Sequence, residues 1–277
     1  MNGIIDCPHS IYFFRGDVEN FDFDKATNTL RDWFIVPLGR PVINPPTQKR
    51  QTIDIPGANG ILDVSNSLTH YPVFNNRQGS LQFAVLNDVP RHDWLTINTK
   101  IMKFLQGNEV KFFLEDDMKY FYEGQVWMEN WDSRNDGTWS EVTLSYDVQP
   151  YRRAIYASVD DWLWDPFNFE TDVVTTTVFS NIEVNSVDWV EHDFTGLIDM
   201  MPVMPKFTVT VPEGQAIYAQ LYNTDLKLNW KDVNNGQPLT SGTFYDCILC
   251  EVTPESQVKM RFKGQGSLQM DFRSGRL

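Results

Sequence analysis

Cysteine is scarce in this chain, with 3 among 277 residues, and long apolar runs are missing. Three cysteines cannot build a disulfide scaffold, so the fold must depend on a hydrophobic core. Cys247 and Cys250 form a CxxC pair, but the surrounding alternation predicts a strand that places the two thiols on opposite faces. That arrangement favours buried structural cysteine over a redox centre, which needs a helix start to lower a thiol pKa.

No apolar run approaches the roughly 18–20 residues that a membrane span requires. The first residues carry no basic segment followed by an apolar segment, so the sequence predicts no signal peptide. Together with the low cysteine content, this favours synthesis in a reducing cytoplasm. We therefore expect no membrane anchoring.

Positive charge is also in deficit, since 23 Lys and Arg face 37 Asp and Glu, for a net charge of −14. The basic residues are scattered rather than clustered. A free-standing nucleic-acid-binding protein needs a basic patch for the phosphate backbone, so the composition argues against that class. The acidic balance equally disfavours binding to anionic membranes.

Catalytic and metal-binding patterns are missing as well. The four histidines, His9, His70, His92 and His192, show no HxH or HExxH spacing, and no GxSxG, GxxxxGK[ST] or GxGxxG occurs. The acidic run 115–117 lacks calcium-loop spacing and is better explained as a solvated hairpin tip. In Asp132–Gly137 a cation, Arg134, stands where a calcium ligand is required, so this segment is interpreted as a turn. We expect no enzyme activity, no metal and no cofactor.

What the chain does have is aromatic, β-type patterning, with 19 Phe, 9 Trp and 10 Tyr. Residues 1–155 are predicted to form a first domain with short strands, a proline-rich extended arm over Pro37–Arg50, and strands at Gln51–Ile55, Gly60–Val64 and Gly79–Leu86. One amphipathic helix is expected over Arg91–Gln106, because Trp94, Ile97, Ile101 and Leu105 form a single apolar stripe. A hairpin is expected from Val110 to Met128, and a strand follows at Trp139–Val148.

Residues 156–277 are predicted to form a second, all-β domain of sandwich or jelly-roll type. Short apolar alternations recur between turn signals such as Asn234–Gly236 and Lys263–Gly266. Strands are expected on both sides of the latter, at Gln257–Phe262 and Ser267–Phe272. The fold class is therefore mainly β, with two β-sandwich domains, one α-helix and a long hairpin.

Several segments of the first domain, taken together and in order, resemble the distal tail (Dit) proteins of long-tailed siphophages, a phage tail component. The residues that carry the resemblance are Pro56–Asp63, Asn76–Phe83, Phe104–Gly107, Tyr120–Gly124, Leu144–Tyr151 and, at the C-terminus, Lys263–Leu277. They cover most of residues 50–151 and the last fifteen.

The resemblance implies an architecture and partners. The first domain would be a belt domain forming a hexameric ring around the tail channel, and the second a galectin-like β-sandwich that projects outward. The ring would join the tail-tube protein to the tail-tip hub protein of the virion, with DNA passing through without specific binding. Galectin-like describes the fold only, and sugar-binding residues are not carried over.

Candidate site residues follow from this hypothesis. The interface and turn candidates are Gly57, Gly60, Arg77, Gly79, Lys49 and Arg50, and the channel-lining candidates are Glu115, Asp116 and Asp117. A ring needs a heterologous interface that closes on rotation, which free strand edges and the extended arm can supply. An acidic lumen would let DNA slide, because no counterion-releasing contacts would form.

Two other function classes are left open. The second domain could be an adhesion module that binds carbohydrate of the host cell wall by stacking sugars on Trp162, Trp164, Trp189 and Trp230, with Phe167 and Phe169 nearby. Core packing is the simpler explanation of these aromatics. A wall-degrading enzyme would need two carboxylates at a set separation, for which the sequence offers no support.

Overall fold

A computed structural model describes residues 9–16, 18, 20–67, 72–86, 94–133, 140–156, 181–195, 202–203, 205–224, 227–245 and 255–277. The chain divides into two compact units, Met1–Lys49 with Phe74–Ile155, and Arg50–Val73 with Tyr156–Leu277. This division groups residues 50–73 with residues 156–277, and the predicted domains 1–155 and 156–277 stay a prediction.

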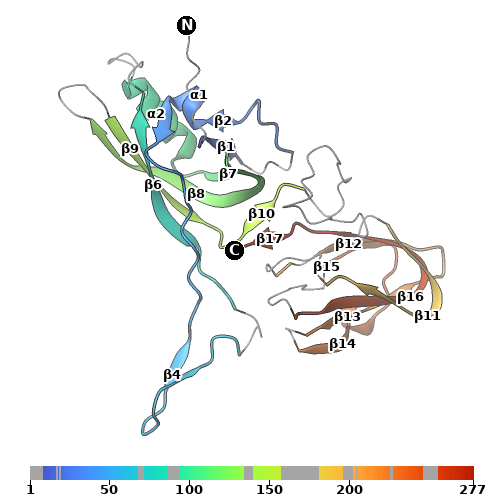
Figure 1. The fold of residues 1–277 in the computed structure, drawn as a ribbon. Coiled ribbons are helices and arrows are strands. Elements are labelled where there is room, and N and C mark those ends of the chain that lie inside the picture. Colours follow the sequence, from blue (N-terminus) through green and yellow to red (C-terminus); the bar gives the residue numbers. More distant parts are fainter. Residues whose placement is uncertain are drawn as a thin grey trace. The chain divides into compact units, whose positions relative to one another are not determined.

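The first unit is one curved antiparallel sheet with short helices (Figure 1). Its strands run in the order β2-β1-β7-β8-β9-β6-β3, and β10 pairs with β8. The elements are β1 (Ile11–Arg15), β2 (Thr27–Asn28), α1 (Thr29–Trp33), β3 (Ile35–Pro37), β6 (Arg77–Val85), α2 (Trp94–Leu105), β7 (Glu109–Leu114), β8 (Asp117–Ser133), β9 (Ser140–Val148) and β10 (Arg152–Ala154).

Both faces of this sheet carry apolar side chains, because β7 buries consecutive residues rather than alternate ones. Phe112 belongs to the larger core, which Ile97, Ile101 and Leu105 of α2 cover. Phe113 belongs to a smaller aromatic cluster on the opposite face, with Phe14, Ala26 and Phe121. Three residues of the predicted apolar stripe are therefore confirmed as the side that packs on the sheet, whereas Trp94 of the same stripe is 42% exposed.

Helix α1 was not expected, since Arg91–Gln106 was the one helix predicted in the first domain. Asn28 caps it: the Asn28 Oδ1 accepts from the amides of Leu30 and Arg31, and Asp32 Oδ2 accepts from the amide of Asn28 at 2.8 Å. This reciprocal capping stabilises a short helix. Phe34 ends it in the left-handed conformation, with φ of 55°.

The second unit holds a curled six-stranded sheet and a separate two-stranded hairpin. Within the sheet the order is β14-β13-β16-β12-β15, and β11 pairs with β16. The elements are β4 (Thr52–Asp54), β5 (Ile61–Asp63), β11 (Ile182–Asp193), β12 (Lys206–Thr210), β13 (Ile217–Asn223), β14 (Leu228–Asp232), a 3-10 turn (Val233–Gly236), β15 (Gly242–Tyr245), β16 (Val258–Asp271) and β17 (Gly275–Arg276).

Strand β16 corrects one prediction, because the turn expected at Lys263–Gly266 is continuous strand. Its first half pairs with β13 and its second half with β12. Gly264 and Gly266 lie at the change of partner, with φ of 122° and 148°. A Cβ at either residue would meet the neighbouring strand's backbone, at Ala216 or Thr210. The glycines therefore bend a strand instead of ending one.

The predicted mainly β class is confirmed by both units. The core of the second unit is apolar and continuous, with Phe207, Met260, Phe262, Leu268 and Met270 almost fully buried. Among the described residues, no helix is long and apolar enough to span a membrane.

Candidate functional site

The acidic turn 115–117 joins β7 to β8 more tightly than predicted, since Leu114 already pairs with Asp117. Asp116 is held by two side chains: Arg40 Nε donates to its Oδ2 at 2.7 Å, and His9 Nδ1 lies 3.1 Å from its Oδ1. Partial desolvation tends to raise the pKa of Asp116, but the hydrogen bonds from Arg40 and His9 leave this pKa below its ordinary value.

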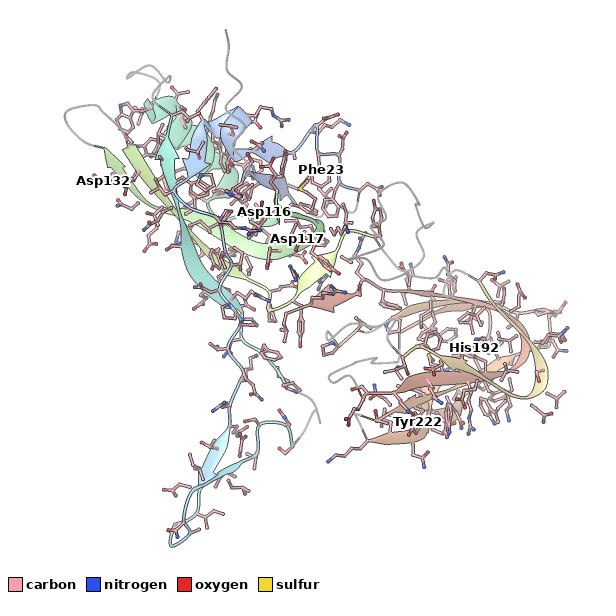
Figure 2. All side chains as sticks on the ribbon, viewed as in Figure 1. Phe23, Asp116, Asp117, Asp132, His192 and Tyr222 are labelled. Carbon is pink, nitrogen blue, oxygen red and sulfur yellow. The ribbon has the colours of Figure 1, made fainter. Side chains whose placement is uncertain are left out.

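The other two carboxylates of the turn are also engaged. Glu115 Oε2 accepts from the amide of Ser10 at 2.7 Å, and the Glu115 amide donates to the Ser10 carbonyl at 3.0 Å. Asp117 is paired with Arg152 of β10. The turn therefore ties together the start of β1, the loop at residue 40 and β10. Figure 2 labels Asp116 and Asp117 beside β8. A role in lining a channel stays a prediction.

Arg77 at the start of β6 is buried, with 5% of its surface exposed. Its Nε donates to the carbonyl of Pro150 at 2.7 Å and its Nη1 to the carbonyl of Asn44 at 3.1 Å, while Nη2 finds no partner in the described part of the chain. Burial lowers the pKa of Arg77. The guanidinium thus joins the extended segment around residue 44 to the end of β9.

Gly79 supports the same junction. A Cβ built on Gly79 would lie 2.5 Å from both Asn44 Nδ2 and Tyr146 Oη, so only glycine fits. The Tyr146 hydroxyl accepts from the amide of Asn44 at 2.9 Å, and Asn44 Nδ2 donates to the Gln78 carbonyl at 2.9 Å. The structure therefore shows internal roles for Gly79 and Arg77, and their part in an interface stays a prediction.

The hairpin β4–β5 follows the predicted arm, Pro37–Arg50, in the sequence. Ile53 pairs with Leu62 across the two strands, and the Gly57 and Gly60 of its turn have φ of 85° and 86° with open space around them. Lys49 and Arg50, just before β4, are exposed. Four large apolar side chains of this hairpin are also exposed, by 44–66%: Ile53, Ile55, Ile61 and Leu62.

This hairpin is unusual because it exposes apolar side chains although it forms a separate two-stranded sheet. A two-stranded sheet has no core of its own and is only marginally stable alone. Its Ile53–Leu62 pair occupies one face, whereas the pair Asp54–Ile61 is on the other. Such a surface is typical of a segment that docks on another protein.

The structure describes two of the aromatic residues that were considered for sugar stacking, Trp189 and Trp230. Trp162, Trp164, Phe167 and Phe169 lie outside the described residues, as do Cys7, Cys247, Cys250, His70 and His92. Trp189 and Trp230 are half-buried on the second unit, and both contact Arg261.

In the described part of the chain, the other candidate catalytic and metal-binding residues do not form a site. Within the described ranges no group of three His, Cys, Asp or Glu could hold a metal ion. His192 packs edge-on against Phe262, and burial lowers its pKa. Asp132 lies in β8, opposite Glu141, and residues 134–139 of the expected turn after it lie outside the described part.

A comparison with solved structures found a full-length match, whereas no protein-family model and no curated protein matched. One matching crystal structure is described as "SPP1 Dit (gp 19.1) Protein, a Paradigm of Hub Adsorption Apparatus in Gram-positive Infecting Phages", with a TM-score of 0.56 and 14% sequence identity. It covers 96% of this chain and 99% of that chain. The chain therefore shares, over nearly its whole length, the fold of a phage Dit protein.

Proposed function

We propose that this chain is a structural protein of a phage tail, non-enzymatic, which forms a ring at the distal end of the tail. The observation that carries the proposal is the fold, which matches a Dit protein from end to end. The sequence resemblance in residues 50–151 points the same way, although identity with that structure is low.

In this proposal six copies close a ring, with residues 1–155 as the belt domain and residues 156–277 as a galectin-like outer domain. The ring joins the tail-tube protein to the tail-tip hub protein and lets DNA pass without specific binding. The acidic turn 115–117 borders the channel, where carboxylates repel phosphates. The protein is then a component of the virion tail tip that is synthesised in the host cytoplasm.

The β4–β5 hairpin supports the proposal as the ring contact. A heterologous interface uses two different surfaces of one chain, and an exposed apolar hairpin is a suitable donor to the next copy. Its Ile53–Leu62 face would be covered by the neighbour, together with the basic pair Lys49 and Arg50. Since this face is exposed in the single chain, covering it would remove apolar surface from water.

Light scattering and negative-stain electron microscopy of the purified full chain test the proposal. We expect a particle of six chains with a central hole. The double variant Ile53→Ser/Leu62→Ser should shift the mass toward the monomer, whereas Ile61→Ser, on the opposite face, should leave the ring intact. If the protein stays monomeric, pull-down with tail-tube protein decides: no capture and no ring would overturn the proposal.

A further inference from the structure

The second unit carries a surface on which two cations are surrounded by aromatic rings. Lys259, Arg261 and Lys263 alternate along β16 with Met260 and Phe262, which are fully buried. The three cations therefore share the outward face of the sheet. Strand β13 pairs Tyr222 with Lys259, Gln220 with Arg261 and Tyr218 with Lys263 on the same face.

The rings lie close to the two cations at the C-terminal end of this row. The Arg261 Cζ is 4.1 Å from the ring centroid of Trp230 and 4.9 Å from that of Trp189. The Lys263 Nζ is 4.7 Å from the centroid of Trp189 and 5.4 Å from that of Tyr218. We call these five residues the cation–aromatic face: Trp189, Tyr218, Trp230, Arg261 and Lys263.

Among the described residues, Arg261 and Lys263 have no direct anionic partner, in contrast to Lys259. Lys259 Nζ is paired with Glu191 Oε1 at 2.9 Å, although Arg261 is the cross-strand partner of Glu191. Neither Arg261 nor Lys263 has a carboxylate in ion-pair distance within the described ranges. The net charge of the chain is −14, so these two cations are opposite in sign to the chain as a whole.

Two hydrogen bonds orient the Arg261 guanidinium and the neighbouring Gln220 amide. Arg261 Nε donates to Gln220 Oε1 at 2.7 Å, and Gln220 Nε2 donates to Asp232 Oδ1 at 2.6 Å. This chain of hydrogen bonds uses one guanidinium nitrogen and leaves both Nη groups without a protein acceptor in the part of the chain described. A carboxylate or phosphate accepts in a bidentate manner from such a pair of donors.

We propose that the cation–aromatic face binds an anionic polysaccharide, a chain of sugar rings that bear carboxylate or phosphate groups. Arg261 and Lys263 bind the anionic groups, and the partly exposed rings of Tyr218, Trp189 and Trp230 contact the apolar faces or edges of the sugars. Tyr218 is 40% exposed, so it is accessible to a ligand. The acidic remainder of the chain would repel such a polymer, which confines binding to this face.

This inference develops the carbohydrate-binding alternative and does not rest on ring assembly, since every residue of the face lies on one unit of one chain. A neutral sugar would need freely stacked rings, but here Arg261 lies over both Trp rings. An acidic polypeptide would satisfy the charges without the aromatic rings. The charge and the rings together favour an anionic sugar over either.

Calorimetric titration of the full chain at low salt tests the proposal, with oligogalacturonate and a phosphorylated mannan as probes. We expect binding of at least one of these, weakened as salt rises. Lys263→Gln and Arg261→Gln should each weaken it about five- to tenfold, the loss of roughly one charged contact. Lys231→Gln is the matched control, because Lys231 pairs with buried Leu221 and so lies on the opposite face of the sheet.

Thermal unfolding of each variant shows that the second unit is folded, and Lys263→Gln suffices if Arg261→Gln fails this check. Neutral dextran and polyglutamate are the comparison ligands. If polyglutamate bound as tightly as the anionic sugars, the ligand would be an acidic protein and the proposal would be wrong. If dextran bound as tightly as they do, charge would play no part in binding and the proposal would also be wrong. Absence of binding to both anionic probes, or equal weakening by Lys231→Gln, would also overturn the proposal.

Discussion

Arg40 Nε donates a hydrogen bond to Asp116 Oδ2 at 2.7 Å across 76 positions of sequence. The pair connects the first residues of the extended arm to the turn between β7 and β8. Because both side chains reach solvent, the pair contributes through position more than through energy. The hydrogen bond holds the start of the arm, at Arg40, against the turn between β7 and β8.

The Asp116 contacts predict a pH dependence. The folded-state pKa of this carboxyl is lowered, so its contribution to stability is complete above the unfolded-state pKa and is lost as pH falls through the folded-state value. Asp116→Asn should therefore flatten the loss of thermal stability between neutral and acidic pH. Glu109→Gln, an exposed carboxylate of β7, is the control. Identical pH profiles for wild type and Asp116→Asn would contradict this account.

Arg77 predicts a large effect on the stability of the first unit. Arg77→Met removes the donors to the Pro150 and Asn44 carbonyls and should cost roughly 2–4 kcal/mol in the free energy of unfolding. Chemical denaturation measures this cost. Arg50→Met, which changes an exposed arginine, should be neutral. A cost below about 0.5 kcal/mol for Arg77→Met would show that the buried guanidinium does not act as a clamp.

Gly60 predicts an effect on assembly without a large effect on the fold. Its φ of 86° is strained for any residue with a Cβ, by about 1–2 kcal/mol, but its surroundings are open. Gly60→Val should therefore distort the β4–β5 hairpin and reduce ring formation, measured by light scattering, while the melting of the first unit stays unchanged. Gly39→Val is the control, since Gly39 has no positive φ and open surroundings. Undiminished ring formation by Gly60→Val would contradict the role of this turn.

Substitution of Gly264 is expected to lower the free energy of unfolding by more than backbone strain alone would. Gly264→Ala places a Cβ against the Ala216 carbonyl and should destabilise the second unit by roughly 3 kcal/mol or more. Gly214→Ala separates the two effects, because Gly214 also has a positive φ, of 78°, but lies in open space. It should cost only about 1–2 kcal/mol. Equal costs in urea unfolding would show that β16 and β13 can move apart.

Local patterns were sufficient for elements whose side chains alternate or recur regularly. The apolar stripe of α2 and the alternation of β6, which overlaps the predicted strand Gly79–Leu86, depend on neighbours within a few residues. Helix α1 could have been found from Asn28, because asparagine is a preferred N-cap residue.

The amino-acid sequence by itself determined the mainly β class, the main helix, the glycine turn at Gly57 and Gly60 and the acidic balance, because each follows from short-range periodicity or composition. Only the tertiary structure decided which groups meet. It brought Arg40 to Asp116, Arg77 to Pro150, and Arg261 between Trp189 and Trp230. It also made Gly264 and Gly266 a bend within β16 instead of a turn. Those pairings join residues far apart in the chain, and strand order and register, which no local pattern encodes, set their distances.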